Sequence, residues 1–435
     1  MNFEESYKYL LSLGNEVTAM KLGLESMTKL LHALGDPQNS YLKVQVAGTN
    51  GKGSVCAFVE AICVSAGIKV GVTTSPHLIS VTERVRVDGK PISEESFADL
   101  ATRVHAVAEE LVQLGELERV PTYFEQVTAV ALLAFAEANV KLAVLETGLG
   151  GRLDATTAAG AEIAAITRID FDHQQYLGET IEQIAAEKAA IIHKGSTVVV
   201  GDQSPEALKV ILDRCRELKI IPSSASKRYI WQTDISRKTS VHERDVDPPS
   251  DPGVTPSLKG RHQLENAYTA IMLAGSLAND FGLDISEDQI RNGIENAHHP
   301  GRLELRGRYL FDGAHNVGGA NALRNFLNEE IDKPITLVFG AMNDKDIDAI
   351  AEILFPLANM LVLTRPSNER ATDPAELEFL ATRINGSALI INTGSVGEAL
   401  EKAYELSRPD ALILVTGSLY LVGEAQKLLT GGSGI

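Results

Sequence analysis

Cysteine is scarce in this chain of 435 residues. The three cysteines, Cys56, Cys63 and Cys215, form no C-x-x-C pair and are odd in number, which disfavours a disulfide framework and fits a reducing compartment. Positive charge is also in deficit, because 40 Lys and Arg stand against 58 Asp and Glu, giving a formal net charge of -18. This charge disfavours nonspecific binding to nucleic acid or to an anionic membrane. A few placed Lys and Arg would have to hold any anionic ligand.

Long hydrophobic runs are missing as well. The most apolar helical stretch, VTAVALLAFAEANV, is interrupted by Glu137 and is shorter than the roughly 20 residues that span a bilayer. The first residues, MNFEESYKYL, contain neither the basic nor the apolar segment of a secretory signal. We therefore expect a cytoplasmic protein with no membrane partner, and by default a monomer.

The sequence has the composition of a folded α/β protein. Hydrophobic residues make up 44% and charged residues 23%, which are ordinary values for a globular chain. Apolar strands alternate with helical patterns along nearly the whole sequence, beginning with the strand at Leu42–Ala47, and this alternation predicts parallel sheets. Pro and Gly in AHHPGR interrupt the pattern, so we predict two domains over residues 1–297 and 298–435. The second domain is expected to be smaller, doubly wound and Rossmann-like. A polar stretch from Ser223 to Lys259 is expected to form loops and short strands.

The stretch VAGTNGKGSV, from Val46 to Val55, has the residues of a phosphate-binding loop but departs from the pattern G-x-x-x-x-G-K-[ST] at two positions. Val46 replaces the first glycine, and Gly53 separates Lys52 from the hydroxyl of Ser54. The stretch still follows a predicted strand and opens a predicted helix, where backbone N–H groups and a lysine hold phosphates. This context favours a nucleoside triphosphate site and makes the first domain a P-loop-type ATPase domain.

Two other functions of the loop were considered: a turn that binds no ligand and a dinucleotide-binding loop. A glycine-rich turn between strand and helix with no ligand would show the same residues. The dinucleotide fingerprint G-x-G-x-x-G does not fit, because the glycines are Gly48, Gly51 and Gly53.

The loop and its surroundings resemble a known family. GTNGKGS is similar to the ATP loop of the Mur ligase superfamily, and the other motifs resemble its folylpolyglutamate synthase and dihydrofolate synthase branch. These motifs are spread over almost the whole chain: LGLESM, TSPHL, TERVRV, TYFEQVT, ETGLGGRLDATT, FDHQQYLG, EKAAI, HQLENA, PGRLE, FDGAHN and TGSLYLVGE. One departure is Ser26, where this branch often has an Arg.

The resemblance implies a set of site residues. It implies that ATP binds to Thr49, Asn50, Gly51, Lys52, Gly53, Ser54, Asn266, Arg302 and Asp312. It implies Mg²⁺, two ions in our expectation, with Ser75, Glu146 and His173 as ligands. It also implies that Lys188 is carbamylated and that Lys52, Lys188 and His315 take part in catalysis. Taken singly, each has an ordinary alternative, such as a helix cap, an ion-paired lysine or a polar loop histidine.

The resemblance further places a pterin-bearing substrate against three segments. These are Leu24, Glu25, Ser26 and Met27; Thr122, Tyr123, Phe124 and Glu125; and Leu153, Asp154 and Ala155. Tyr123 and Phe124 offer an aromatic face, and they can equally be core residues.

The function that the resemblance implies is ATP-dependent addition of L-glutamate to folates, and also to dihydropteroate, through an acyl phosphate. The small-molecule partners are then ATP, L-glutamate, and folate or dihydropteroate, with no nucleic acid. Three alternatives stay open: a folylpolyglutamate synthase without the dihydropteroate reaction, another Mur-type ligase with a different acceptor, and a P-loop ATPase that makes no amide bond.

Overall fold

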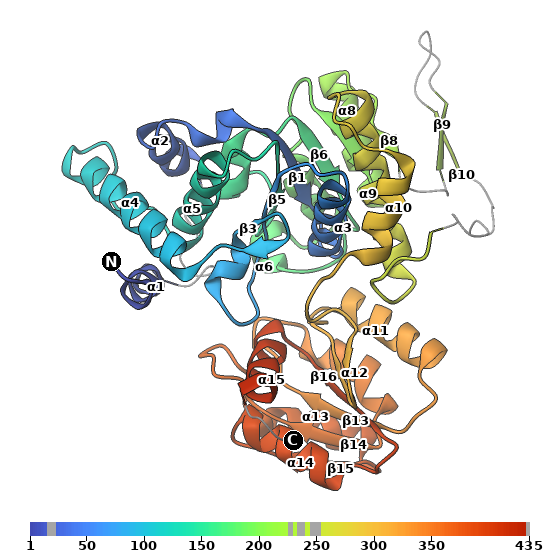
Figure 1. The fold of residues 1–435 in the computed structure, drawn as a ribbon. Helices are drawn as coiled ribbons and strands as arrows, with labels where there is room; N and C mark the ends of the chain where they lie inside the picture. Colours follow the sequence, from blue (N-terminus) through green and yellow to red (C-terminus); the bar gives the residue numbers. More distant parts are fainter. Residues whose placement is uncertain (15–22, 225–228, 233–239, 244–253, 432–435) are drawn as a thin grey trace. The chain divides into compact units, whose positions relative to one another are not determined.

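The computed structural model describes residues 1–14, 23–224, 229–232, 240–243 and 254–431. Much of the polar stretch expected between Ser223 and Lys259 therefore lies outside the described residues. The chain forms two compact units (Figure 1). The first unit contains Met1–Ile169, Leu177–Ser257 and Leu264–His298, and the second contains Asp170–Tyr176, Leu258–Gln263 and His299–Ile435.

An eight-stranded sheet forms the centre of the first unit. Its strand order is β4-β3-β2-β5-β1-β6-β7-β8, and all strands from β2 to β8 in this order are parallel. The antiparallel pair β3 and β4 turns at Asp88 and Gly89. The strands are β1 Leu42–Ala47, β2 Val70–Thr73, β3 Arg86–Val87, β4 Lys90–Pro91, β5 Leu142–Glu146, β6 Ile163–Ile166, β7 Thr197–Val200 and β8 Ser223–Ser224. A separate hairpin pairs β9 Tyr229–Gln232 with β10 Ser240–Glu243.

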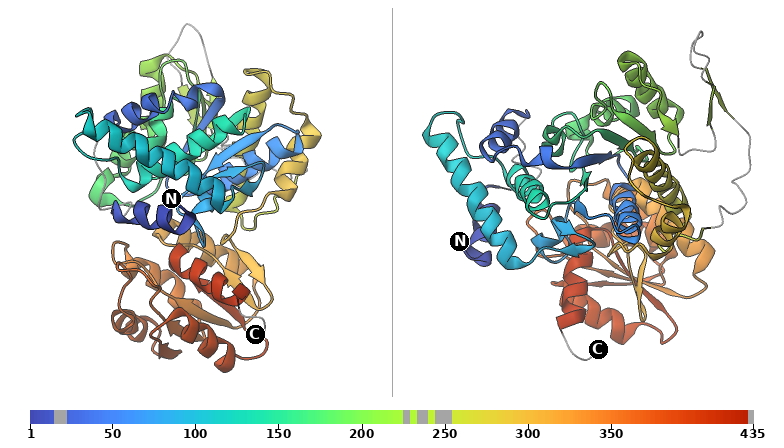
Figure 2. Two further views of the ribbon diagram at one scale, coloured as in Figure 1. Left: turned by 60° about the vertical axis from the view of Figure 1, so that its left-hand side comes forward. Right: turned by 45° about the horizontal axis from the view of Figure 1, so that its top comes forward.

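Helices lie on both faces of this sheet (Figure 2). Successive side chains of a strand point to opposite faces, so in-register residues such as Ala47, Ile166 and Val200 share one face, where they pack with α7 and α8. On the same face α5 places Phe135 over Gly71 of β2. The helix α3 packs against β1, β2 and β5 and contacts α10.

The helices up to residue 296 are α1 Phe3–Ser12, α2 Glu25–Ala33, η1 Pro37–Ser40, α3 Lys52–Ser65, η2 Val81–Arg84, α4 Glu94–Gln113, α5 Tyr123–Glu137, η3 Ala155–Ala159, α6 Gln174–Leu177, α7 Ile181–Ala189, α8 Pro205–Leu218, α9 His262–Asn279 and α10 Glu287–Asn296.

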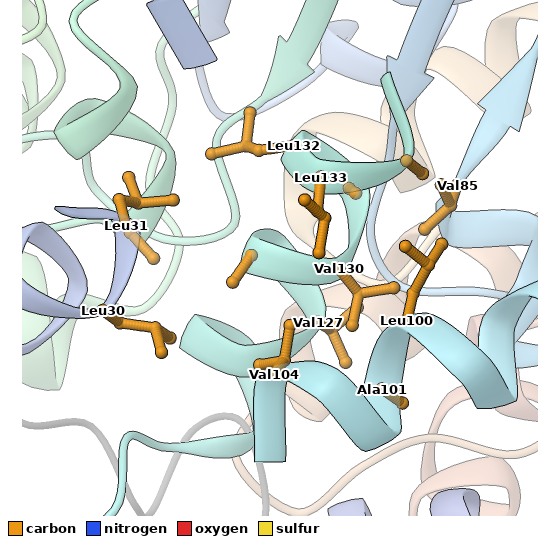
Figure 3. Close-up of a cluster of buried hydrophobic side chains, with 14 of the residues drawn as sticks. Leu30, Leu31, Val85, Leu100, Ala101, Val104, Val127, Val130, Leu132 and Leu133 are labelled. Carbon is orange, nitrogen blue, oxygen red and sulfur yellow. The ribbon is translucent and has the colours of Figure 1, made fainter. Parts of the chain in front are cut away.

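The largest apolar cluster of the first unit lies around α5 (Figure 3). Val127 and Val130 of α5 meet Leu100 and Val104 of α4, and Leu30 of α2 lies in the same cluster. The sequence of α5 is apolar nearly all round, which is typical of a helix enclosed by other elements. This packing fixes α5 and its first turn, the TYFE segment, against the sheet.

The second unit has a six-stranded sheet in the order β11-β12-β16-β13-β14-β15. Only β11 is antiparallel to its neighbour. The apolar cluster on one face draws residues from α11, α12 and α13, whereas α14 contacts β13 and β14, and α15 contacts β16. The strands are β11 Glu304–Arg306, β12 Tyr309–Phe311, β13 Ile335–Phe339, β14 Met360–Leu363, β15 Leu389–Asn392 and β16 Leu412–Thr416. The helices are α11 Val317–Glu330, α12 Ile347–Leu354, η4 Phe355–Leu357, α13 Pro374–Asn385, α14 Val396–Leu406 and α15 Leu419–Gly431.

The predicted fold class is confirmed: the protein is α/β, with a parallel-sheet unit of the P-loop type and a smaller doubly wound unit. The first strand has the predicted bounds, and the predicted helix that follows it begins at Lys52. Within the described part of the chain, no helix combines the length and the hydrophobicity needed to cross a membrane.

Candidate functional site

A tight loop joins β1 to α3 at the carboxyl end of the strand. Gly48 and Gly51 have φ of 154° and 91°, values that favour glycine. A Cβ at Gly48 would lie 1.9 Å from Thr167 Oγ1, and a Cβ at Gly51 would lie 2.2 Å from Asn266 Oδ1. The loop therefore needs glycine at both positions. Asn266, which the resemblance implies for ATP, lies directly against the loop.

The backbone N–H groups of this loop fall into two sets. The N–H groups of Thr49 and Asn50 donate to the Arg168 carbonyl, at 2.8 and 3.1 Å, and so hold the loop in shape. The helix α3 then begins at Lys52, and no side chain of the described residues caps it. Because the first N–H groups of a helix have no partner inside the helix, the first turn of α3 offers donors and a positive dipole to an anion.

Two lysines meet at one carbonyl of the loop. Lys52 Nζ donates to the carbonyls of Gly48 and Thr49, both at 3.1 Å. Lys188 Nζ, carried by α7 and buried, donates to the same Gly48 carbonyl at 2.9 Å. The structure thus brings together Lys52 and Lys188, two of the residues that the sequence predicts for catalysis.

Ser75 and Glu146 follow neighbouring strands and lie together. Glu146 ends β5 and is buried, and its Oε2 accepts a hydrogen bond from the Ser75 backbone N–H at 3.1 Å. A carboxylate and a hydroxyl are oxygen donors of the kind that Mg²⁺ prefers, and this ion commonly takes one or two protein carboxylates and completes its shell with water and phosphate oxygens. Among the described residues, no group of three or more His, Cys, Asp or Glu side chains is placed to hold a metal ion.

The glycine-rich segment after β5 is packed closely. A Cβ at Gly148 would lie 2.6 Å from Phe124 Cζ, so the aromatic ring sits directly on the loop. Asp154 Oδ2 accepts from the Leu149 N–H at 2.9 Å, and its Oδ1 accepts from the Thr156 N–H at 3.0 Å. Burial raises the pKa of Asp154, although these hydrogen bonds oppose the shift. Asp154 therefore shapes the loop from inside.

The residues predicted for the pterin differ in how accessible they are. Met27, Tyr123 and Ala155 are buried among apolar side chains. Leu24, Thr122 and Phe124 are half-buried, Glu25 and Leu153 are exposed, and Ser26 and Glu125 are buried. Thr122 and Glu125 form a capping box at the start of α5. Arg84 lies over the Tyr123 ring, 5.4 Å from its centroid.

In the second unit, Arg302, Asp312 and His315 lie around one turn. Asp312 Oδ2 accepts from the Leu303 N–H at 3.0 Å, and Asp312 Oδ1 accepts from the Ala314 N–H at 2.9 Å. Burial raises the pKa of Asp312, while Arg302 opposes that shift. His315 Nδ1 lies 2.7 Å from the Gly313 carbonyl and must carry the proton, because a carbonyl only accepts.

His173 belongs to the second unit, in a cluster of charged and polar side chains. Lys345 Nζ lies 2.7 Å from Asp172 Oδ1 and 3.2 Å from His173 Nε2, and Asn316 Nδ2 donates to Asp172 Oδ2 at 3.0 Å. His173 has φ of 50°, which is unusual for a residue with a side chain and is found more often at functional sites. Burial would raise the pKa of Asp172, but Lys345, His173 and His315 hold it well below its usual range. Burial and Lys345 lower the pKa of His315 to about 4.

Several residues around these sites were not predicted from the sequence. Thr167 and Arg168 shape the phosphate loop, and Asp172, Asn316 and Lys345 make the charged cluster. Asp172 and Asn316 stand in quoted motifs, beside His173 and His315, so the motif context was a signal for them. Lys345, 173 positions from Asp172, had none.

The cysteines are free thiols of the interior. Cys56, Cys63 and Cys215 are all free and buried. Burial raises the pKa of Cys63 and of Cys215 to about 12 and the pKa of Cys56 well above its usual value. The thiols stay protonated near neutral pH and are poor nucleophiles.

This fold, with its phosphate loop and second doubly wound unit, defines a Mur-type ligase. The Mur ligase middle domain family matches residues 46–274, more than half of the chain, and the family described as Mur ligase, glutamate ligase domain matches residues 301–419.

Similarities to individual proteins indicate which branch of the Mur ligase family this chain resembles. A probable bifunctional folylpolyglutamate synthase/dihydropteroate synthase of Halobacterium salinarum is 37% identical over 98% of this chain and 51% of that protein, so the chain spans about half of this relative's length. The structure of Mycobacterium tuberculosis folylpolyglutamate synthase complexed with ADP has a TM-score of 0.86 and 30% identity, covering 100% of this chain and 99% of that one. The bifunctional folylpolyglutamate synthase/dihydrofolate synthase of Yersinia pestis, complexed with AMPPNP and a Mn ion, has a TM-score of 0.82 and 28% identity, covering 99% of this chain and 98% of that one.

The chain therefore belongs to the folylpolyglutamate synthase and dihydrofolate synthase branch of the Mur ligase family. The resemblance seen in the motifs is confirmed.

Proposed function

We propose that this chain is an ATP-dependent ligase that joins L-glutamate to the carboxylate of a folate and releases ADP and phosphate. The observation that carries the proposal is the loop at the end of β1, where Lys52 and the uncapped first turn of α3 would form a phosphate site in a chain of this family. Residues 1–297 would form the ATP-binding domain and residues 298–435 the glutamate ligase domain, in line with the two family matches.

The reaction has two steps. A carboxylate oxygen of the acceptor attacks the γ-phosphorus of ATP, and the bond between this phosphorus and the oxygen that bridges it to the β-phosphate breaks. ADP departs, and the acceptor is now an acyl phosphate. The amine of glutamate then attacks the acyl carbon, loses its proton, and expels phosphate together with the acceptor's oxygen. Catalysis of such transfers rests on positioning and on neutralising charge.

The nucleotide-binding residues that the motifs imply fall into two groups. Lys52 and the N–H groups of Gly53 and Ser54 would bind the phosphates, beside Thr49, Asn50 and Gly51. Asn266, Arg302 and Asp312 would bind the adenosine part. Asn266 already lies against Gly51, which supports its place at the nucleotide.

The metal site fits the donors that are present. Ser75 and Glu146 are placed together, and these two with His173 would hold Mg²⁺. The bound ion supplies positive charge that offsets the charge of the phosphates. A carbamate on Lys188 would add an anionic group near this site. A carbamate nitrogen keeps one hydrogen, so the bond from Lys188 to the Gly48 carbonyl is compatible with that modification.

His315 would help to orient the incoming amino acid. Its proton is held on Nδ1 by the Gly313 carbonyl, so Nε2 presents a lone pair. With a pKa of about 4, the ring is neutral at physiological pH. A neutral acceptor of this kind can accept a hydrogen bond from the ammonium group of glutamate.

We also propose that the enzyme accepts dihydropteroate. The proposal is motivated by the TYFE and GLGGRLDA segments, which meet where Phe124 packs on Gly148. Leu24 to Met27, Thr122 to Glu125 and Leu153 to Ala155 would surround the pterin, with the exposed Leu153 and the half-buried Phe124 as its apolar contacts.

The deciding experiment supplies the full chain with ATP, Mg²⁺ and labelled glutamate, and with either dihydropteroate or a reduced folate monoglutamate. Labelled product from both acceptors is expected. Product from the folate alone would limit the enzyme to folylpolyglutamate synthesis. Phosphate release that needs ATP but no amino acid would instead indicate an ATPase, and glutamate transfer only to other acceptors would indicate a different Mur-type ligase.

A cytoplasmic location and a monomeric state complete the proposal. The three free buried thiols favour a reducing compartment. Size-exclusion chromatography with light scattering tests the monomer directly.

A further inference from the structure

A buried amide side chain connects β1, the strand that leads into the phosphate loop, with the segment after β5. Gln45 lies in β1 and is fully buried. Its Nε2 donates to Thr157 Oγ1 at 2.7 Å and to Thr156 Oγ1 at 2.9 Å, and Thr147 Oγ1 lies further away, at 3.3 Å. Because an amide nitrogen has two hydrogens, the two shorter contacts use both of them. Gln45 therefore joins β1 to η3.

The two threonines fix which way this amide points. The Thr157 hydroxyl donates to the Gly151 carbonyl at 2.7 Å, and the Thr156 hydroxyl donates to Asp154 Oδ1 at 2.5 Å. Each hydroxyl has one hydrogen, so both threonine oxygens can only accept from Gln45. The amide nitrogen must therefore face the threonines, while Oε1 has no hydrogen-bond partner among the described residues.

This network supports the tip of the loop after β5. Gly151 and Asp154 are buried, whereas Arg152 and Leu153 between them are exposed. The Gly151 carbonyl and the Asp154 carboxylate are each bonded to a threonine that accepts from Gln45. The exposed tip is thus held at both of its ends, and each end is one threonine away from the amide of Gln45.

The helix α7 supports the same loop from another side. A Cβ at Gly151 would lie 2.7 Å from the Glu187 carbonyl oxygen, and the Arg152 N–H donates to that carbonyl at 3.0 Å. Lys188, the next residue of α7, donates to the Gly48 carbonyl at 2.9 Å. The loop after β5 therefore lies between α7 and β1, and Gln45 supplies the hydrogen bonds from β1.

We propose that Gln45 is a positioning residue for the acceptor: through Thr156 and Thr157 its amide holds the loop tip at Leu153 where the pterin-bearing substrate binds. This inference rests on the proposed function. Gln45 is fully buried and acts only through the two threonines. The phosphate loop has its own support, since the Thr49 N–H donates to the Arg168 carbonyl. Loss of the amide should therefore weaken acceptor binding and spare the nucleotide.

The test compares four variants of the full chain. Gln45→Met keeps an unbranched side chain but removes the donors, and Thr157→Val removes the hydroxyl that Thr157→Ser keeps. Lys43→Met is the matched control, because Lys43 is a buried polar residue of the same strand whose partner, at 3.0 Å, is Glu162 and not the loop. For each variant, kcat, the KM for a reduced folate monoglutamate, the KM for ATP and the melting temperature are measured.

Gln45→Met is expected to raise the KM for the folate about 3- to 30-fold, as for the loss of one or two hydrogen bonds. The KM for ATP and kcat should change less than about twofold. Thr157→Val should behave in the same way, and Thr157→Ser should stay near wild type. Lys43→Met should lower the melting temperature, because it leaves Glu162 without its partner, while the KM for the folate stays within about twofold of wild type.

An unchanged KM for the folate in Gln45→Met would overturn the inference. An equal rise in Lys43→Met would also overturn it, since destabilisation alone would then explain the change, and so would an equal rise in the KM for ATP. If Gln45→Met does not fold, Thr157→Val and Thr157→Ser decide, and an equal KM for the folate in these two overturns the role of the network.

If the wild-type chain shows no glutamate-dependent turnover, the proposed function fails separately. Hydrogen exchange of the backbone amides of residues 149–156 in wild type, Gln45→Met and Lys43→Met then tests the support of the loop. Faster exchange in Gln45→Met alone supports the role of Gln45, and any other pattern overturns it.

Discussion

The two units pair the lysines of their polar sites in opposite ways. In the first unit Lys52 donates to two neutral carbonyls, each at 3.1 Å, so its positive charge stays available to a phosphate. In the second unit Lys345 lies 2.7 Å from the Asp172 carboxylate, and its charge is balanced inside the protein. A lysine that is hydrogen-bonded only to carbonyls keeps a charge that can bind an anionic ligand. A lysine that is ion-paired with an aspartate contributes to stability instead. Removal of the ion pair is therefore expected to lower stability, whereas removal of Lys52 is expected to lower activity.

The largest effect is expected from breaking the balanced pair. Asp172→Asn leaves the buried ammonium of Lys345 without its counter-ion, which should lower the free energy of unfolding by about 3–5 kcal/mol. Adding Lys345→Met should recover part of this loss, since an apolar side chain needs no partner. Chemical denaturation of the single and double variants measures both changes. Equal stability of wild type and Asp172→Asn would show that the pair has no structural role.

The same pair predicts a pH dependence. The folded-state pKa of Asp172 is lowered, whereas an unfolded aspartate titrates near pH 4. The stability that the pair contributes is therefore present above about pH 4 and is lost as the pH falls through the folded pKa. The difference in unfolding free energy between wild type and Asp172→Asn should be constant from about pH 5 to 8 and should shrink below about pH 4. A difference that grows on acidification would contradict the sign of the shift.

Lys52→Ala should leave stability intact and remove activity. The side chain gives up bonds to two carbonyls of a half-buried loop, so the melting temperature should change little. Loss of a charge on the reacting phosphates should lower kcat by about 100- to 1000-fold. Lys209→Ala, at an exposed position of α8, serves as the control. Near-wild-type phosphate release by Lys52→Ala would show that the loop has been assigned wrongly.

Two glycine variants distinguish an effect on the nucleotide site from the effect of backbone strain alone. Gly51→Ala and Gly35→Ala both put a side chain at positive φ, 91° and 84°, which costs about 1–3 kcal/mol. Only Gly51→Ala also meets Asn266, whereas a Cβ at Gly35 has nothing within 4 Å. Both should therefore lower the melting temperature, and Gly51→Ala alone should weaken ATP binding, as measured by nucleotide titration. Equal nucleotide affinity in both variants would remove the role of this contact.

The smallest expected signal is spectroscopic. His315 should stay neutral, with the proton on Nδ1, as the pH falls from about 8 to 5, because burial and Lys345 lower its pKa to about 4. Nitrogen chemical shifts of the imidazole report both the protonation state and the tautomer. Titration of this ring near pH 6.5 would contradict the geometry.

The strands and loops whose residues are consecutive in the chain could be predicted from the sequence. The strand at Leu42–Ala47 has the predicted bounds because six consecutive residues form a largely apolar run before a glycine. The loop that follows was predictable because Gly48, Gly51 and Lys52 carry their chemistry in their order along the chain. The charged cluster was not predictable in this way, since Asp172 and Lys345 are 173 positions apart and no period links them.

The roles of single residues were also harder to predict than their motifs. Asp154 stands in a motif implied for the pterin, and the structure shows its carboxylate on the backbone N–H groups of its own loop. Gln45 stands in no motif, and only the fold brings its amide to Thr156 and Thr157. Which partners a side chain finds is a property of the folded neighbourhood.

The central claim is that the acceptor's carboxylate is activated as an acyl phosphate at the loop of Lys52. The most direct measurement uses a folate whose terminal carboxylates carry ¹⁸O, with ATP, Mg²⁺ and L-glutamate, and follows the released phosphate by mass spectrometry. Each phosphate formed is expected to contain an ¹⁸O from the acceptor. Phosphate that carries no ¹⁸O while the amide is formed would contradict it.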